Sequence, residues 1–187
     1  MFSDGLLLTW LNNLFEDKKI VRTSFDYSSI ASDFFDFCSY KKLKVGLLGG
    51  AEDEISVACE RIKVLHPSLI VSLHRNGYFS SDNEKNDFIN SLIANDVDVV
   101  IVGLGSPLQE DFAIMLYNKM PNLKCVITCG GFITQTSIKA DYYPRLIKKF
   151  GLRWLYRAIL HKHVRKRLFI DYPKFFISYI LLVLQRK

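Results

Sequence analysis

The sequence predicts an α/β fold in which a parallel sheet carries helices on both faces. Four short segments rich in Val, Ile and Leu are expected to be strands: 44–50, 68–74, 97–105 and 124–131. The segments between them repeat apolar residues every three or four positions, as amphipathic helices do. Strands that alternate with helices at this spacing are typical of a parallel sheet.

The first elements alternate in this way from the start of the predicted sheet. "LLLTWLNNLF" (6–15) follows Asp4, a residue favoured at helix N-termini, and is expected to be a helix. "KVGLLGG" (44–50) is an apolar run closed by two glycines, which indicates a buried strand before a tight turn. "DEISVACERIKVLHP" (53–67) has helical spacing, and "SLIVSLH" (68–74) returns to a strand pattern.

The later elements continue the alternation and then break it. "EKNDFINSLIAND" (84–96) and "PLQEDFAIMLYNKMP" (107–121) are predicted helices on either side of the strand "VDVVIVGLG" (97–105). "KCVITCGG" (124–131) is the fourth predicted strand. After Gly131 the strand pattern stops, and we expect two or three basic helices as an appendage.

The composition is that of a globular protein. A chain of 187 residues, 49% of them hydrophobic, can bury one sizeable core. The four cysteines form no CxxC pair and have no histidine at metal-ligand spacing, so we expect no metal site and a reduced, cytoplasmic compartment. No apolar run reaches the roughly 18 residues of a membrane-spanning helix, and the first ten residues do not look like a signal peptide.

Charge divides the chain into two parts. Residues 139–187 hold thirteen Lys or Arg against two acids, a net charge of +11, whereas residues 1–138 carry −5. We therefore expect two regions: an α/β ligand-binding domain at 1–138 and a basic helical appendage at 139–187. A region with this much positive charge is expected to interact with phosphate groups, in nucleic acid, anionic lipid or a phosphorylated substrate. Nucleic acid is disfavoured as the partner, because large aliphatic residues interrupt the basic ones and no reader motif is present.

The segment "VDVVIVGLGSPLQED" (97–111) is the strongest candidate for a binding site. In a parallel sheet, ligands bind beyond the carboxyl ends of the strands, where glycine turns and helix N-termini let backbone N–H groups approach an anion. Gly103 and Gly105 are placed for such a turn, and Gln109 and Glu110 fall in the first turn of the next helix. Helix capping explains Glu110 equally well. Neither GxGxxG nor a P-loop is present, so these residues do not name the ligand.

The same segment, with what surrounds it, resembles the WecG/TagA/CpsF glycosyltransferase family (glycosyltransferase family 26). The family pattern is a strand ending in G-x-G-x-P-x-Q-E and a later G-L-E-W-[LY]-Y-R segment, here "FGLRWLYR" (150–157). Earlier landmarks occur in the same order: "DG" at 4–5, Arg22 and Asp26, "LLGG" at 47–50 and "NGYF" at 76–79. The resemblance runs from Asp4 to about Arg167.

The resemblance implies a Rossmann-like fold and an inverting sugar transfer. The donor would be a UDP-sugar carrying an N-acetylhexosamine-type sugar, such as N-acetylmannosamine or its uronate, and the acceptor a polyprenyl-diphosphate-linked saccharide of cell-surface polysaccharide synthesis. The protein would lie on the inner face of the bacterial membrane as a peripheral protein that contacts anionic lipid. No cofactor is implied, and a homo-oligomer is left open.

The resemblance also assigns roles to particular residues. Asp4 would be the general base, although a helix N-cap is the ordinary role for such an aspartate. Arg22 would hold a phosphate or the base, and Tyr78 would line the site, although core packing is the commoner role for this aromatic pair with Phe79. The other residues implied to bind substrate are Gly49, Gly103, Gly105, Gln109, Glu110, Arg157 and Arg167.

Several positions depart from the family pattern. Family members carry a further segment ahead of the "DG", so we expect this chain to lack the N-terminal part. The family aspartate after the fourth strand is Thr134 here, and the G-L-E-W glutamate is Arg153. The alternative reading is therefore a degenerate, inactive relative that binds nucleotide or anionic lipid.

Overall fold

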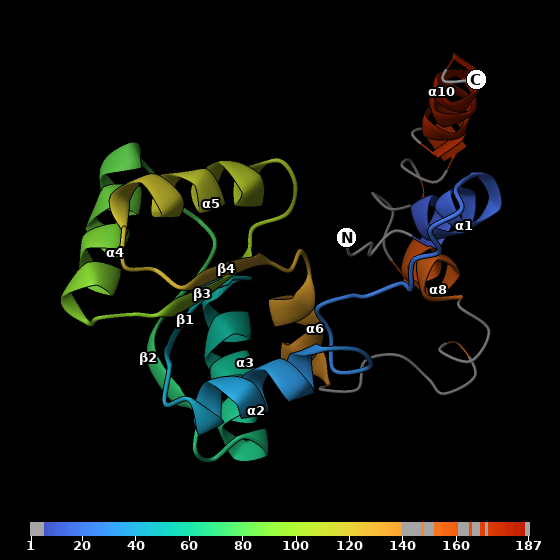
Figure 1. Cartoon of the computed structure of the whole chain (residues 1–187). Helices are drawn as coiled ribbons and strands as arrows, with labels where there is room; N and C mark the ends of the chain where they lie inside the picture. Colours follow the sequence, from blue (N-terminus) through green and yellow to red (C-terminus); the bar gives the residue numbers. More distant parts are fainter. Residues whose placement is uncertain are drawn as a thin grey trace. The chain divides into compact units, whose positions relative to one another are not determined.

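The structure is a computed structural model that describes residues 6–139, 147, 152–160, 165, 169–170 and 172–185. The chain divides into two compact units: Ser24–Tyr142, and a second unit that joins Met1–Thr23 to Tyr143–Lys187 (Figure 1). The N-terminal helix thus belongs with the C-terminal segment. The division after residue 138, with a role for each part, stays a prediction.

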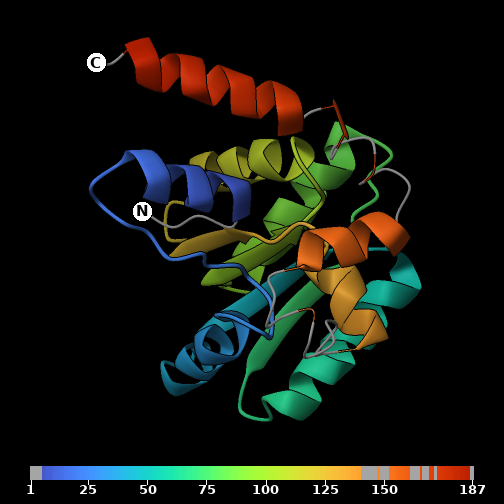
Figure 2. The ribbon, with the colours of Figure 1, turned by 90° about the vertical axis from the view of Figure 1, so that its right-hand side faces the viewer.

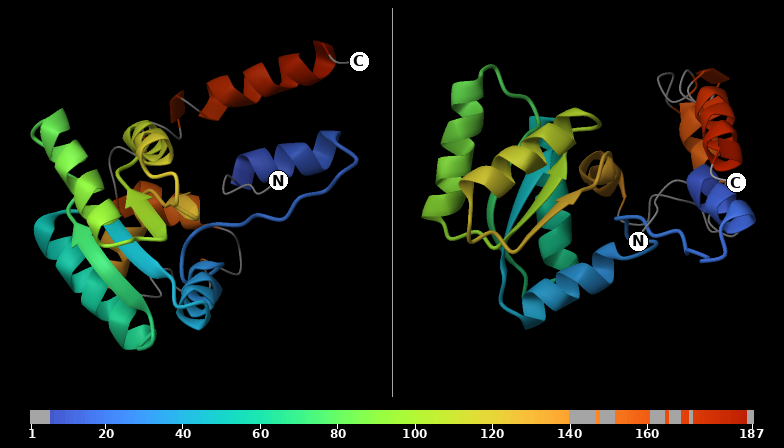
Figure 3. Two further views of the ribbon diagram at one scale, coloured as in Figure 1. Left: turned by 60° about the vertical axis from the view of Figure 1, so that its left-hand side comes forward. Right: turned by 45° about the horizontal axis from the view of Figure 1, so that its top comes forward.

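The unit Ser24–Tyr142 is built on a four-stranded parallel sheet. The strands are β1 (Lys44–Gly49), β2 (Ile70–Arg75), β3 (Val99–Gly103) and β4 (Cys125–Thr128). They pair in the order β2-β1-β3-β4, and every pairing is parallel. Figure 3 shows the strands side by side. The predicted α/β class and parallel sheet are confirmed.

Helices cover both faces of the sheet, as predicted. On one face lie α2 (Ala31–Tyr40), α3 (Glu52–Leu65) and α6 (Phe132–Ile138), and on the other α4 (Asp82–Ala94) and α5 (Leu108–Lys119) (Figure 2). Because side chains alternate along a strand, β1 sends Val45 and Leu47 into the first core and Leu48 into the second. Each central strand is therefore buried on both faces, which explains its continuous apolar sequence.

The helices α2 and α6 were not foreseen from the sequence. Both are short, and α2 places Ala31, Phe35 and Cys38 in the core at helical spacing. Phe35 and Phe132 belong to an aromatic cluster, and the centroids of these two rings lie 6.1 Å apart. The segment 24–30 before α2 adds further aromatic rings to this cluster, and no strand or helix pattern marks it.

One aspartate organises the amino edge of the sheet. The Asp98 carboxylate accepts a hydrogen bond from the Lys44 backbone N–H at 2.8 Å and pairs with the Lys124 ammonium at 2.8 Å. Backbone bonds also run from Asp98 N to Lys44 O and from Lys124 N to Asp98 O. The starts of β1, β3 and β4 are thereby joined. The hydrogen bond from Lys124 and that from the Lys44 backbone hold the pKa of Asp98 below its ordinary value.

The second unit contains α1 (Leu6–Phe15), α8 (Arg153–Leu160) and α10 (Tyr172–Gln185). Asn13 closes the turn after α1, because its side chain bonds both the N–H and the carbonyl of Ile20. Phe15 and Tyr179 place their ring centroids 6.4 Å apart, so α1 contacts α10. Among the described residues, no helix has the length and apolar character needed to cross a bilayer.

Candidate functional site

The carboxyl edge of the sheet is packed through glycine backbone. A Cβ on Gly49, whose φ is +145°, would lie 2.5 Å from the Gly103 carbonyl oxygen, and one on Gly103 would lie 2.9 Å from the Gly130 carbonyl oxygen. These distances are too short for any side chain, so the ends of β1, β3 and β4 approach at backbone contact. The result is an edge at which the strand ends meet through main-chain atoms.

The turn from β3 into α5 has a different reason for its glycine. Gly105 has a φ of +74°, and within the described residues no heavy atom lies within 4 Å of a Cβ built there. Glycine is required at this position by the positive φ, and not by crowding from neighbouring atoms. The peptide bond Ser106–Pro107 is cis, and Gln109 N–H then donates to the Gly105 carbonyl at 3.0 Å. The N-terminus of α5 therefore starts beside open space at the carboxyl edge.

Gln109 ties two of these turns together. Its side chain is buried, its Oε1 accepts the Gly130 N–H at 2.9 Å, and its Nε2 donates to Glu110 Oε1 at 2.8 Å. Gln109 therefore positions the β4–α6 turn against the start of α5. Contact between Gln109 and a substrate stays a prediction.

Glu110 is exposed in the first turn of α5. The amide that Gln109 donates lowers the pKa of Glu110, and the carboxyl is therefore ionised at neutral pH. Its negative charge also suits the helix N-terminus, as the capping reading expects. A direct role in binding stays a prediction.

A second link fixes α6 against α3. Glu54 Oε2 accepts the Ala51 backbone N–H at 2.8 Å and the Thr134 hydroxyl at 2.9 Å. Arg61 donates to the carbonyls of Thr136 and Ser137 in the last turn of α6. The turn after β4 is thus held from both ends of α6.

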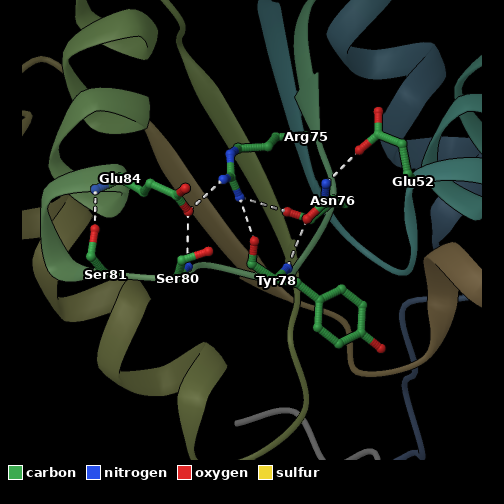
Figure 4. Close-up of polar contacts among 7 residues, drawn as sticks. All are labelled: Glu52, Arg75, Asn76, Tyr78, Ser80, Ser81 and Glu84. Carbon is green, nitrogen blue, oxygen red and sulfur yellow. Dashed lines mark hydrogen bonds and ion pairs between the residues drawn. The ribbon is translucent and has the colours of Figure 1, made fainter.

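The loop between β2 and α4 carries the predicted pair Tyr78 and Phe79, and their environments differ. The Phe79 ring packs on Phe112 with centroids 5.5 Å apart, so core packing is right for Phe79. Tyr78 is 74% exposed, so core packing is wrong for Tyr78. Figure 4 shows its ring extending away from Arg75 and Glu84.

The loop lies at the carboxyl edge because Gly77 binds there. Gly77 N–H donates to the Gly50 carbonyl at 2.9 Å. A Cβ on Gly77 would lie 3.3 Å from Gly49 Cα and 2.8 Å from the Leu104 side chain. Tyr78 therefore directly follows a residue, Gly77, that lies against the carboxyl ends of β1 and β3.

This edge suits an anionic ligand held by main-chain groups. The helices α3, α4 and α5 all begin after strands that end here, and the dipole of a helix favours an anion at its N-terminus. Each of the three also carries acidic side chains in its first turn, which oppose this attraction. Among the described residues, no cluster of His, Cys, Asp or Glu could hold a metal ion.

Comparison with known proteins adds a family to this geometry. The model of the glycosyl transferase WecG/TagA/CpsF family matches residues 1–187. The chain belongs to this family. This family member thus has a parallel sheet whose carboxyl edge is packed through glycines.

Characterised relatives include enzymes with different sugars. The chain is 46% identical over 180 residues to the UDP-Gal:α-D-GlcNAc-diphosphoundecaprenol β-1,4-galactosyltransferase of Shigella boydii, which covers 96% of this chain and 75% of that protein. It is 28% identical over 144 residues to the N-acetylglucosaminyldiphosphoundecaprenol N-acetyl-β-D-mannosaminyltransferase of Bacillus spizizenii, covering 77% of this chain and 54% of that enzyme. The Staphylococcus aureus enzyme of the same name is 25% identical over 117 residues, covering 63% and 44%.

The remaining residues predicted for this WecG/TagA/CpsF family member belong to the other unit. Arg22 is half-buried and follows α1 in the sequence. Arg157 lies in α8, but its side chain is outside the described structure. Asp4 and Arg167 both lie outside the described residues. The predicted residues of the unit Ser24–Tyr142 all lie at the carboxyl edge of its sheet: Gly49, Gly103, Gly105, Gln109, Glu110 and Tyr78.

Sequence reasoning missed Arg75 and Glu84. Arg75 Nη2 pairs with Glu84 Oε2 at 3.0 Å, and its Nη1 donates to the Tyr78 carbonyl at 3.0 Å (Figure 4). The spacing Ser81-x-x-Glu84 is a helix-start signature that marks Glu84. No local pattern marks Arg75, because its partners follow it in a loop.

Proposed function

We propose that the chain is an inverting glycosyltransferase that moves one hexose unit from a UDP-sugar to a polyprenyl-diphosphate-linked saccharide in cell-surface polysaccharide synthesis. The supporting observation is 46% identity across 96% of the chain with an enzyme whose name states such a transfer. The main-chain edge at Gly49, Gly103 and Gly105 adds independent support, because it suits the diphosphate of a nucleotide sugar.

Galactose is the donor sugar to test first. The relative that is 46% identical uses UDP-galactose, whereas those named as N-acetylmannosaminyltransferases are 28% and 25% identical. An N-acetylhexosamine, expected from the sequence, is the second candidate. Both groups of relatives are named for an acceptor in which N-acetylglucosamine is joined to diphosphoundecaprenol, so this is the acceptor to use.

The transfer needs two contributions from the protein: a general base, and groups that stabilise the leaving diphosphate. Asp4 accepts the proton of the acceptor hydroxyl as that oxygen attacks the anomeric carbon, which inverts its configuration. The bond from that carbon to the diphosphate breaks, and UDP leaves with its negative charge. Helix N-termini such as those at the carboxyl edge are suited to stabilise the charge of the departing diphosphate. The resemblance in sequence implies separate phosphate-binding roles for Arg22, Arg157 and Arg167.

The helix α10 is proposed to contact the membrane. Its side chains Phe175, Ile177 and Leu181 are exposed, and Lys174 lies beside them. Apolar burial at the lipid interface combines with attraction between basic residues and anionic headgroups, about 1 kcal/mol for each well-placed charge. Co-sedimentation with anionic vesicles should be lost in a chain that ends at Ile170, and binding that ignores both truncation and anionic lipid would contradict this contact.

The test of the function is UDP release. Full-length protein should release UDP from UDP-galactose only when the N-acetylglucosaminyl-diphosphoundecaprenol acceptor is present. The Asp4→Asn variant should bind UDP as wild type does but transfer about 100-fold more slowly. UDP binding without turnover on any UDP-sugar would instead identify the inactive relative named as the alternative.

A further inference from the structure

We propose that Arg75 and Glu84 are positioning residues for the sugar-nucleotide donor. They hold the β2–α4 loop, residues 76–81, in the shape that presents the Tyr78 ring to the ligand. The inference deepens the proposed function and rests on it.

Arg75 donates hydrogen bonds to the loop from one side. Its Nη1 donates to the carbonyls of Asn76 at 3.3 Å and Tyr78 at 3.0 Å. The guanidinium also lies over the Phe79 ring, 4.1 Å from its centroid. An arginine with these contacts fixes both the backbone of Tyr78 and the direction in which the next residue enters the core.

Glu84 completes the arrangement from the helix side. Its Oε2 pairs with Arg75 Nη2 at 3.0 Å and also accepts the Ser80 N–H at 2.9 Å. The Ser81 hydroxyl caps α4 by accepting the Glu84 N–H at 3.3 Å. The carboxylate therefore joins the strand end, the loop and the helix start (Figure 4).

Asn76 fixes the side of the loop that faces α3. Its Oδ1 accepts the Tyr78 N–H at 2.9 Å, and its Nδ2 donates to Glu52 in the first turn of α3. With the Gly77 bond to the Gly50 carbonyl, every residue from 75 to 81 makes a hydrogen bond or a ring contact within this network.

The Tyr78 side chain is the group that the network leaves exposed. Its backbone N–H and carbonyl are both bonded, yet 74% of the residue remains open to solvent. A large aromatic ring whose backbone is fixed at the carboxyl edge of the sheet is suited to stack on a flat ligand face. The nucleobase of a UDP-sugar, or the apolar face of its hexose, offers such a surface.

The prediction concerns donor affinity more than turnover. Arg75→Gln removes the ion pair and the two-carbonyl fork, and should raise KM for UDP-galactose about tenfold while kcat stays within about twofold. Tyr78→Ala should give a similar rise. Glu84→Gln weakens the ion pair and should give a smaller change in the same direction.

A double-mutant cycle shows whether Arg75 acts through Tyr78. In the Tyr78→Ala background, Arg75→Gln should add less than about twofold to KM, because the ring that it positions is gone. Arg75→Lys keeps the positive charge but offers one nitrogen where arginine uses Nη1 for the two carbonyls and Nη2 for Glu84, so its KM should be intermediate. Lys85→Gln is the matched control, because it breaks the exposed Lys85–Asp82 pair in the same helix, and it should leave KM unchanged.

The outcomes separate this inference from the function on which it rests. A wild-type protein that releases no UDP and binds none would overturn both. If wild type turns over, a lowered melting temperature with unchanged KM in Arg75→Gln would make the network purely structural. Equal effects of Arg75→Gln with and without the Tyr78 ring would also overturn the positioning role.

Discussion

The two edges of the same sheet are built by different means. At the amino edge, one carboxylate gathers strand starts, because Asp98 bonds the Lys44 backbone and pairs with Lys124. At the carboxyl edge, strand ends meet through glycine, as at Gly49 and Gly103, and side chains such as Tyr78 remain exposed. The polar groups of the amino edge stabilise the fold, whereas the carboxyl edge leaves the Tyr78 ring exposed to a ligand.

The largest effect is expected from adding one methyl group at the carboxyl edge. In Gly49→Ala the new Cβ would lie 2.5 Å from the Gly103 carbonyl oxygen, at a φ of +145°. The strand ends must then separate, so we expect the free energy of unfolding to fall by about 3 kcal/mol or more. Urea denaturation measures this loss. Gly105→Ala is the matched control, because no described residue lies near its Cβ and strain alone should cost about 1 kcal/mol.

A somewhat smaller effect is expected at the amino edge. Asp98→Ala removes the acceptor of the Lys44 N–H, and the free energy of unfolding should fall by about 2 kcal/mol. Lys124→Met should cost less, because the Lys124 side chain is 59% exposed and water screens its pairing with Asp98. Neither change should alter UDP binding. A loss of UDP affinity in folded Asp98→Ala would contradict the separation of the two edges.

Acid should weaken the amino edge in a defined range. The folded-state pKa of Asp98 lies below its unfolded value, so its contribution to stability is complete above about pH 4 and is lost as pH falls through the folded pKa. Stability curves of wild type and Asp98→Asn should therefore run parallel from pH 7 to about pH 5 and converge below about pH 4. Curves that converge already near neutral pH would assign the effect to another group.

The smallest effect is expected where one side chain links two turns of the carboxyl edge. Gln109→Ala frees the Gly130 N–H and should weaken UDP binding by about 1 kcal/mol, roughly fivefold in Kd. Gln109→Glu keeps an acceptor for Gly130 but replaces the amide that donates to Glu110 with a second carboxylate, so it should lose more. Isothermal titration with UDP distinguishes the two variants. Superimposable titrations of Gln109→Ala and wild type would show that the Gly130 turn does not contribute to the site.

The sheet was predictable because its signals are local and strong. Each strand is a short apolar run, and each of the helices α3, α4 and α5 shows helical spacing. The helix α2 was missed, because the aromatic residues around Phe35 have meaning only once they pack with Phe132, far along the chain. Local spacing cannot report a contact of this kind.

The candidate site was predictable in part for a similar reason. Glycines at strand ends indicated the edge, and they lie there. The bond from Gln109 to the Gly130 N–H could not be foreseen, because it joins two loops that approach only when β3 and β4 pair. Arg75 escaped notice because a single arginine carries no pattern, and its function depends on the loop that follows it.

The strand order also sets the sequence in which the sheet can be completed during synthesis. Since β1 lies between β2 and β3, it can pair with β2 as soon as residues 44–75 have left the ribosome. Its other edge then stays open until β3 is made, and that edge is a run of apolar residues. A nascent chain paused between β2 and β3 should therefore be the stage most prone to join strands with a neighbouring chain.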